Sequence, residues 1–376
     1  MAQAGNPDVV LAHDYLLVMR GAERVFAAIA DLFPGAPIFT LLYDEQALGR
    51  RFDGHAVTPS PLQRLGIRQH DFRRLLPLYP LATARLRLPP CEVVLSSSSA
   101  FAHGVRAPDG ATHICYCHAP FRYAWYEQER AIAEVSPLVR PALRLALAGM
   151  RRWDLAASRR VDHYLANSIL TRDRIRRYYG REAHVIHPPV DTHRFSPGPS
   201  GDALLVVSEL VAHKRVHVAL EAARRAGARI RVAGSGPDRE ALAAAFPKAE
   251  FLGRVGDEEI AQLYASARAV VVPSMEEFGI TAVEAQAAGR PVIAAAAGGA
   301  LETVVDGQTG LLAELDDIES FARAMRSIDS LDFDPAVAVE NASRFSVASF
   351  QRSISTYVEE ALRENGGSAR ASRLIR

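Results

Sequence analysis

Two carboxylates with a glycine between them are the residues of this sequence whose types and spacing best suit ligand chemistry. Glu276 and Glu284 are eight positions apart. Each carboxylate can accept hydrogen bonds from a pair of sugar hydroxyls. The backbone amides of Phe278, Gly279 and Ile280 lie between them, where a helix begins and its dipole attracts phosphate. A ligand with hydroxyls at both ends and phosphate in the middle is a nucleotide sugar.

The elements around this pair place one carboxylate on a loop and the other on a helix. A strand is predicted at 269–272, directly before the pair. A helix of small residues is predicted at 282–288, closed by Gly289 and stopped by Pro291. Glu276 therefore lies on the loop that follows the strand, and Glu284 lies about one turn into the helix.

A basic pair and a glycine-rich turn follow two earlier strands of the same half. Lys214 and Arg215 come after a predicted strand at 204–208, where their charges can neutralise a departing diphosphate. The alternative is a solvated basic loop before a helix. Gly234 opens a Gly-Ser-Gly-Pro turn, which suits either a tight strand-to-helix connection or close approach to a base or phosphate.

The first half offers candidates for contacts with a second substrate. Gly21 lies between the first strand and the first helix, where backbone amides can approach a phosphate. His118 follows a predicted strand at 112–117, and the residues after it that could line an acceptor pocket are Arg122, Tyr123 and Trp125. An ordinary capped loop and a structural histidine are the alternatives.

Strands alternate with helices in both halves of the chain, a pattern typical of parallel sheets covered by helices. The stretch 191–202 is rich in Pro, Gly and Ser, which indicates a linker. We therefore expect an α/β protein with two Rossmann-like parallel-sheet domains facing a cleft. The predicted domains are 1–196 on the acceptor side, 197–345 on the nucleotide-sugar side, and a last helix within 346–376 that crosses back and ends in a flexible tail.

Composition favours a globular protein of the cytoplasm. Of the 376 residues, 49% are hydrophobic and 23% charged. No apolar run reaches the roughly 18 residues of a spanning helix, and the N-terminus lacks a signal-peptide pattern. The three cysteines, Cys91, Cys115 and Cys117, are predicted to be core thiols, and the Asp-Phe-Asp at 332–334 is predicted to be a turn, not a metal site.

Charge is divided unevenly along the chain. Residues 1–199 carry a net charge of +7 and residues 200–376 carry −6. The segment 59–90 interleaves leucines and aromatic residues with six arginines. This mixture suits docking on an anionic membrane surface. The alternative is an amphipathic helix packed on its own domain with a solvated basic face.

The motif Glu-x-Phe-Gly-x-x-x-x-Glu-Ala at 276–285, with Gly-x-Pro-Val-Ile at 289–293, resembles the retaining glycosyltransferase family 4, which has the GT-B fold. The resemblance covers almost the whole chain. Its further matches are His13-Asp14-Tyr15, Arg20-Gly21-Ala22-Glu23, Cys117-His118-Ala119-Pro120 with Arg122-Tyr123-Ala124-Trp125, Asn167-Ser168 and Pro188-Pro189-Val190-Asp191. These motifs look like the bacterial mannosyltransferases that build O-antigen and exopolysaccharide, usually from GDP-mannose.

The resemblance implies a role for each matching residue. Glu284 would hold the ribose hydroxyls and Glu276 those of the donor hexose, with the amides of Phe278, Gly279 and Ile280 on the hexose and phosphates. Lys214 would stabilise the departing diphosphate. The remaining implied contacts are the Gly21 loop amides on the diphosphate, the backbone of Arg254 and Val255 on the base, His118 on the transferred sugar, and Asp14 on the acceptor side.

Two positions depart from the family's pattern near the expected diphosphate. Glu209 stands where the family commonly has Arg, five residues before the lysine, and a carboxylate there would repel phosphate. Arg215 stands where Gly is commoner and would supply the missing charge. Ala22 replaces the usual second Gly of the N-terminal loop.

The expected function is retaining transfer of a hexose, mannose from GDP-mannose, to a lipid-linked or saccharide acceptor. The resemblance implies no metal and no other cofactor. The protein is expected in the cytoplasm, on the inner face of the membrane where 59–90 docks, and no nucleic-acid partner is expected. The alternatives are a non-catalytic nucleotide-sugar-binding protein and a GT-B epimerase acting on UDP-GlcNAc.

Overall fold

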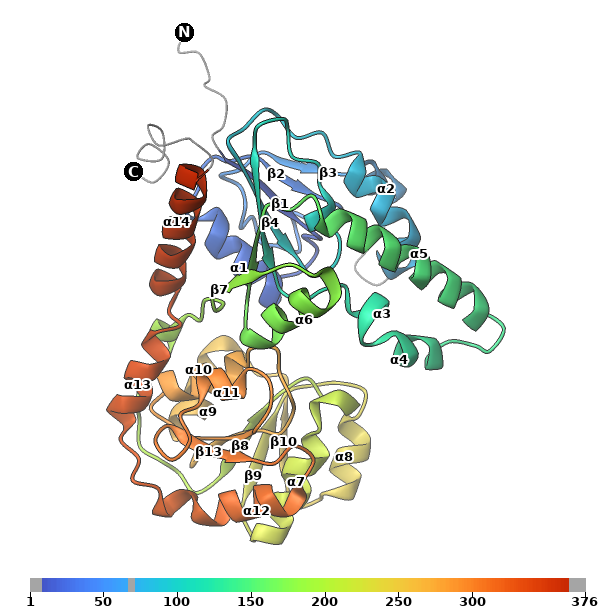
Figure 1. Cartoon of the computed structure of the whole chain (residues 1–376). Helices are drawn as coiled ribbons and strands as arrows, with labels where there is room; N and C mark the ends of the chain where they lie inside the picture. Colours follow the sequence, from blue (N-terminus) through green and yellow to red (C-terminus); the bar gives the residue numbers. More distant parts are fainter. Residues whose placement is uncertain (1–8, 67–71, 365–376) are drawn as a thin grey trace. The chain divides into compact units, whose positions relative to one another are not determined.

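The computed structural model describes residues 9–66 and 72–364, which divide by their contacts into two compact units (Figure 1). Unit 1 comprises the described residues of 1–167, 171–186 and 351–376, and unit 2 comprises 168–170 and 187–350. The sequence analysis placed the first boundary at 196/197, in the linker-like stretch. Residues 187–196 belong to unit 2 because they pack there: Val190 bonds to the carbonyl of Phe345, and Phe195 meets the ring of Tyr264 edge-on at 5.4 Å.

Unit 1 is built on a seven-stranded parallel sheet with the order β3-β2-β1-β4-β5-β6-β7. Its strands are β1 Val9–His13, β2 Ile38–Thr40, β3 Val57–Pro59, β4 Val93–Ser98, β5 Thr112–Cys117, β6 His163–Ala166 and β7 Ala183–Val185. The central strands β1, β4 and β5 are buried along their whole length, as expected for a sheet covered on both faces.

The α-helices of this part of the chain are α1 Gly21–Ala30, α2 Tyr79–Ala84, α3 Arg122–Trp125, α4 Gln128–Ala133, α5 Arg140–Ser158, α6 Ile169–Tyr179 and α14 Val347–Glu364. Short 3-10 helices lie at Pro61–Leu65, Phe72–Leu78 and Ala102–Gly104. From Gln351 onward the described part of α14 belongs to unit 1, where the Gln351 side chain donates to the carbonyl of Ala28 at 3.1 Å.

Unit 2 is built on a six-stranded parallel sheet with the order β10-β9-β8-β11-β12-β13. Its strands are β8 Leu204–Val207, β9 Ile230–Ala233, β10 Glu250–Gly253, β11 Val270–Val272, β12 Val292–Ala295 and β13 Gly310–Ala313. Its α-helices are α7 Val216–Ala226, α8 Arg239–Ala245, α9 Asp257–Ser266, α10 Ile280–Ala287, α11 Ala300–Thr303, α12 Ile318–Ser327 and α13 Pro335–Ser343, with 3-10 helices at Thr192–Arg194, Ala212–Lys214 and Ile328–Ser330.

Alternation along the unit 2 strands separates two hydrophobic cores. Leu205, Val270 and Val272 belong to one buried cluster, and Leu204 and Val271 belong to the other. Successive side chains of a strand point to opposite faces, so an apolar run buries both faces beneath helices. The prediction of an α/β protein with two Rossmann-like parallel-sheet domains is confirmed.

Candidate active site

The loop after β11 is held by a pair of glycines at the end of β12. The amide of Gly299 donates to the carbonyl of Glu276 at 2.9 Å. A Cβ at Gly299 would lie 2.0 Å from the Phe278 carbonyl oxygen, so only glycine lets the two backbones approach this closely. Gly279 then begins α10 in the left-handed conformation, followed directly by Ile280. The loop amides therefore have a fixed place at the start of a helix.

Lys214 and Glu276 form an ion pair on this loop. Lys214 ends the 3-10 helix after β8, and Glu276 follows β11, which is the neighbouring strand. The Lys214 Nζ lies 2.6 Å from Glu276 Oε2, and the buried Ser274 hydroxyl donates to Glu276 Oε1 at 2.5 Å. The two side chains are 27% and 21% exposed, so the pair is held in place yet open to a ligand.

Glu284 is held by a different kind of partner. Its Oε2 accepts a hydrogen bond from the hydroxyl of Tyr264 at 2.8 Å. Burial, followed by the negative charge of Glu284, raises the pKa of Tyr264 well above its usual value. The phenol therefore stays protonated and donates. The carboxylate is oriented one turn into α10, at the opposite end of the amide loop from Glu276.

Arg215 does not stand free beside Lys214. Its guanidinium pairs with Asp316, and its own φ of 53° is left-handed, a conformation that Gly adopts without steric cost. Asp316 is therefore the group that Arg215 would have to exchange for a phosphate, just as Lys214 would exchange Glu276. Glu209 is exposed just after β8. The role of Arg215 in offsetting Glu209 stays a prediction.

The residues expected near the base lie at the ends of β9 and β10. Gly234 follows β9, and its amide donates to the carbonyl of Gly253 at 2.7 Å. Arg254 is exposed directly after β10, and the partly buried Val255 packs on the core of unit 2. All predicted donor residues except Gly21 therefore lie at the carboxyl ends of β8 to β11, the edge where Rossmann-like sheets bind ligands.

In unit 1, the partly buried His118 belongs to a histidine–serine cluster at the end of β5. Its Nε2 lies 2.8 Å from the Ser97 hydroxyl, and His13 Nδ1 lies 3.1 Å from the same hydroxyl. Burial lowers the pKa of His118 to about 4, and burial together with His118 lowers that of His13 to about 3. His118 is therefore uncharged at neutral pH. The sequence analysis missed Ser97, although the run of four serines after a predicted strand was a visible signal.

Asp14 is buried beneath the loop that follows β4. Its carboxylate accepts the four backbone amides of Ser99, Ala100, Phe101 and Ala102 at 2.5–2.9 Å. These bonds occupy both oxygens. We therefore interpret Asp14 as the residue that shapes this loop, not as one that contacts an acceptor.

The other residues expected on the acceptor side differ in exposure. Trp125 is engaged in packing: its Nε1 donates to the buried Asp154 at 2.6 Å, and its ring stacks on Tyr178. Arg122 is exposed, 4.0 Å from Glu127, and Tyr123 is partly buried. Arg122 is thus the exposed member of this set, and Tyr123 and Trp125 are both partly buried.

Gly21 is exposed at the first position of α1, and a Cβ there would meet nothing within 4 Å. The side chain of Glu23 accepts a hydrogen bond from the Arg20 amide at 3.1 Å, which fixes the start of this helix. The role of the Gly21 amide toward a diphosphate stays a prediction.

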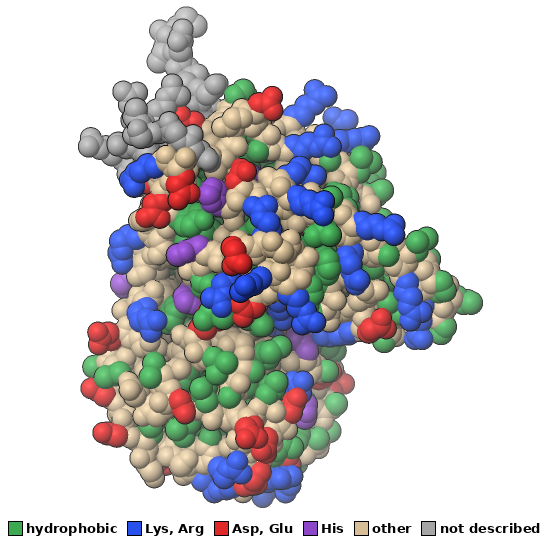
Figure 2. Space-filling model, in the orientation of Figure 1, with side chains coloured by type: hydrophobic (Ala, Val, Ile, Leu, Met, Phe, Trp, Pro, Cys, Tyr) green, Lys and Arg blue, Asp and Glu red, His purple; other side chains and the backbone are tan. Residues whose placement is uncertain are grey.

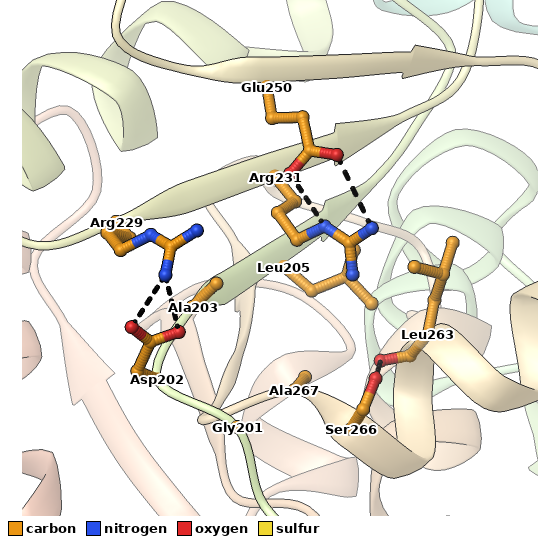
Figure 3. A pocket seen from close by; sticks show the side chains of 10 residues that line it. All are labelled: Gly201, Asp202, Ala203, Leu205, Arg229, Arg231, Glu250, Leu263, Ser266 and Ala267. Atoms are coloured by element: carbon orange, nitrogen blue, oxygen red, sulfur yellow. Dashed lines mark hydrogen bonds and ion pairs between the residues drawn. The ribbon is translucent and has the colours of Figure 1, made fainter.

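A cavity of about 330 Å³ lies at the opposite edge of the unit 2 sheet (Figure 3). Figure 3 shows its two cations, each facing a carboxylate: Arg229 with Asp202 and Arg231 with Glu250. These residues lie at the amino ends of β8, β9 and β10. Because the cavity is at the far end of the strands from Lys214 and Glu276, it is not the donor site.

Metal and membrane features can be stated only for the described ranges. Within residues 9–66 and 72–364, no three His, Cys, Asp or Glu side chains gather in a way that would hold a metal ion. Asp334 instead caps α13 by accepting the amide of Ala336 at 2.8 Å. None of the helices in that part of the chain has both the length and the apolar character needed to cross a membrane.

Two family profiles match this chain, one in each half. Residues 19–194 match the profile described as Glycosyltransferase Family 4, and residues 201–329 match Glycosyl transferases group 1. A D-inositol 3-phosphate glycosyltransferase of Corynebacterium kroppenstedtii is 41% identical over 124 residues, 31% of this chain and 27% of that protein. One from Mycobacterium sp. (strain KMS) is 35% identical over 211 residues, 46% of this chain and 47% of that protein. Each match thus spans less than half of the relative's length.

Solved structures agree with the whole fold. Anabaena HepE in complex with UDP superposes with a TM-score of 0.68 at 18% identity, covering 93% of this chain and 100% of HepE. Sucrose-phosphate synthase from Thermosynechococcus elongatus superposes with a TM-score of 0.72 at 18% identity, covering 95% and 100%. The first half of the chain is thus similar to glycosyltransferase family 4 and the second half to the glycosyl transferases of group 1, and the two Rossmann-like sheets have the GT-B fold.

Proposed function

We propose that this protein is a retaining glycosyltransferase that transfers mannose from GDP-mannose to a lipid-linked or saccharide acceptor in cell-surface polysaccharide synthesis. The observation that carries the proposal is the ion pair of Lys214 and Glu276 at 2.6 Å, beside the amides that begin α10. Glu284 is oriented one turn further on. A cation, a row of amides and two separate carboxylates match a diphosphate flanked by two hydroxyl-bearing sugars.

Donor binding would exchange partners within this pair. The ammonium of Lys214 turns to the diphosphate, and the carboxylate of Glu276 accepts hydroxyls of the hexose while Ser274 keeps its orientation. Each charge is thus compensated before and after the exchange, which avoids leaving a half-buried charge without a partner.

Transfer would proceed on one face of the sugar. The bond between the anomeric carbon and the diphosphate oxygen breaks, and its electron pair stays on the diphosphate, where Lys214 and the loop amides stabilise it. The acceptor hydroxyl oxygen bonds to the same face of the carbon, and its proton passes to the departing phosphate oxygen. The configuration is retained, and neither a metal nor a covalent enzyme intermediate is required.

The identities of the donor and of the acceptor rest on narrower support than the site itself. The motif at Cys117–Pro120 with Arg122–Trp125 resembles mannosyltransferases that use GDP-mannose. The names of the relatives point instead to D-inositol 3-phosphate as acceptor, and HepE was solved with UDP and with UDP-glucose. Both alternatives therefore belong in the test.

The test measures thermal shifts with GDP, UDP, GDP-mannose and UDP-glucose, then transfer of radiolabelled mannose to membrane lipid extract or to D-inositol 3-phosphate. We expect stabilisation by GDP and GDP-mannose and label in the lipid fraction, unchanged by a chelator. Stabilisation by UDP but not by GDP would overturn the mannose assignment. Binding with neither transfer nor hydrolysis would favour a non-catalytic protein, and conversion of UDP-GlcNAc would favour an epimerase.

The chain offers a matched control for the role of Lys214. Its one other lysine, Lys248, is exposed in the turn before β10. Lys214→Ala should lower kcat by about a hundredfold or more, the loss typical when a transition-state charge partner is removed. Lys248→Ala should leave kcat unchanged, and equal loss in both variants would contradict the assignment.

Peripheral association with an anionic membrane through 59–90 is part of this proposal. Residues 67–71 of the segment lie outside the described residues. The flanking parts expose apolar side chains: Leu65 is 57% exposed and Leu81 is 53% exposed. Two arginines of the segment, Arg85 and Arg87, are also exposed. These features support docking of the segment on a membrane surface.

A further inference from the structure

Helix α5 carries the most exposed leucines of the described chain. Leu138, just before the helix, is 92% exposed, and Leu145 within it is 77% exposed. Val139 between them is 51% exposed. Figure 1 shows α5 and the loop that leads into it from α4 extending beyond the sheet of unit 1. Three large aliphatic side chains on a projecting element are a contiguous apolar feature, unlike single leucines scattered on a surface.

Six of the exposed apolar positions follow the helical repeat. They are Leu138, Pro141, Ala142, Leu145, Ala148 and Gly149. Spacings of three and four residues put them on one face of the helix. The opposite face, with Leu147 and Met150, is buried in a core cluster of unit 1. The amino-terminal half of α5 is therefore apolar on both sides, although only one side has a partner within unit 1.

The charges within 135–153 all have one sign, and the exposed Glu134 just before this stretch is paired with Arg130. Residues 135–153 contain four arginines and no acidic residue. Arg144 and Arg152 are exposed along α5, whereas Arg140 donates to the carbonyls of Val135 and Ala133 and holds the hairpin together. We name the surface formed by 138–149 together with Arg144 and Arg152 the α5 ledge.

Helix α5 shares a buried core with a second element that also exposes leucines. Leu75, Tyr79 and Ala82 of the 3-10 helix and α2 belong to the same buried cluster as Leu147 and Met150 of α5. Outside this cluster, Leu78 and Leu81 are 44% and 53% exposed. Figure 2 shows basic and hydrophobic side chains, with few acidic ones, over the region where α2 and α5 are drawn.

We propose that the α5 ledge is a membrane-docking surface, which inserts its leucines between anionic lipid headgroups while Arg144 and Arg152 contact the phosphates. Charge complementarity identifies an anionic bilayer as the partner of this surface. An apolar face edged by arginines and lacking acids matches an anionic bilayer, which offers apolar chains beneath a layer of negative charge. The surface extends the docking expected of 59–90 to a separate element of unit 1.

The test measures binding of the full chain to vesicles by co-sedimentation, without any nucleotide sugar. The vesicles contain phosphatidylglycerol with phosphatidylcholine, or phosphatidylcholine alone. We expect binding to the anionic vesicles, weakened by salt. The double variants Leu138→Ser with Leu145→Ser, and Arg144→Gln with Arg152→Gln, should each weaken binding by about tenfold or more.

Matched controls separate the ledge from general surface effects. Leu301→Ser alters a leucine that is 58% exposed in unit 2, and Arg323→Gln alters an exposed arginine of α12. Neither should change binding. All altered side chains are exposed, so circular dichroism should show intact folding in every variant.

Three outcomes would overturn the proposal. They are wild-type protein that ignores anionic vesicles, double variants that bind as well as wild type, and equal binding to phosphatidylcholine alone. Loss of binding through Leu81→Ser with none through the α5 variants would return docking to 59–90 alone. Since no donor is present, the result does not depend on the proposed transfer, whose failure would show in the radiolabel assay.

Discussion

At the scale of single residues, the two carboxylates of the donor loop differ in their partners. Glu276 faces a cation, Lys214, and a serine hydroxyl, whereas Glu284 faces a buried phenol, Tyr264. If Lys214 binds the diphosphate, the interaction between Lys214 and Glu276 changes as negative charge develops on the diphosphate during transfer. The environments therefore favour separate roles, catalytic for Glu276 and nucleotide-binding for Glu284.

This division predicts different kinetic effects for the two alanine variants. Glu284→Ala should raise KM for the donor and weaken GDP binding by about tenfold, with kcat little changed. Glu276→Ala should lower kcat by about a hundredfold, with a smaller effect on GDP binding, because it removes an interaction to the transferred sugar. Calorimetry with GDP and steady-state kinetics separate the two quantities. Equal effects of both variants on both quantities would refute the division.

At the scale of elements, the donor loop is shaped by backbone contact with the end of β12. Gly298 and Gly299 lie against the carbonyls of Glu276 and Phe278, and the Thr303 hydroxyl donates to the Gly299 carbonyl at 3.0 Å. Beneath α10, Gln286 donates to the Thr303 carbonyl at 2.8 Å and accepts from Asn341 at 2.6 Å. This buried network joins α10, α11 and α13, so the position of the loop amides is set by several helices at once.

Gly299→Ala should displace the loop while the sheet stays folded. The new methyl would lie 2.0 Å from the Phe278 carbonyl oxygen, so the backbone of the donor loop must move. We expect donor affinity to fall about tenfold or more, because small displacements of a positioning loop have large effects. Titration with GDP measures this change.

Gly54→Ala is the matched control, since a Cβ at Gly54 meets nothing within 4 Å. It should bind GDP as wild type does. If Gly299→Ala also binds normally, the loop does not depend on this contact.

At the scale of the whole molecule, the sheet of unit 1 encloses several uncharged histidines. Burial lowers the pKa of His118 to about 4 and, as the main cause, those of His13 and His113 to about 3. All three lie near the serines of β4, with His113 Nε2 2.8 Å from the Ser96 hydroxyl. The folded chain thus holds as neutral groups side chains that take up protons at about pH 6.5 when unfolded.

This arrangement predicts that stability falls on acidification. The stabilising contribution of these histidines is complete above their unfolded pKa of about 6.5, where they are neutral in both the folded and the unfolded chain. Below it the unfolded state binds more protons, so the free energy of unfolding declines as pH drops toward 4 and then 3. Urea unfolding at a series of pH values measures the slope. His113→Gln should reduce the slope by about 1.4 kcal/mol per pH unit, because one titrating group is lost.

His193→Gln is the control for this slope, since His193 is exposed in unit 2. It should leave the slope unchanged. A wild-type slope in His113→Gln would show that this histidine is not held neutral by the fold.

Local pattern was sufficient for the alternation of strands with helices and for the donor motif, but not for every element: β2, β3 and α5 were not predicted. Alternation of apolar strands with helices predicted two parallel sheets, because strand and helix periodicity depend on neighbouring residues only. Helix α10 begins at Ile280, two residues before the expected start at 282, because the loop already turns at Gly279. The same locality made Glu276, Glu284 and Lys214 recognisable, since each lies within a short motif beside a strand.

Only the tertiary structure decided which of these residues meet. Lys214 pairs with Glu276, 62 residues away, because β8 lies beside β11 in the sheet order. The same long-range packing buries Asp14 beneath the loop after β4 and pairs Arg215 with Asp316. It also left Leu138 and Leu145 exposed at 92% and 77%. Sequence determined the elements and their motifs because those depend on neighbours along the chain. Partner choice and exposure depend on strand order and packing, which bring together residues far apart in sequence.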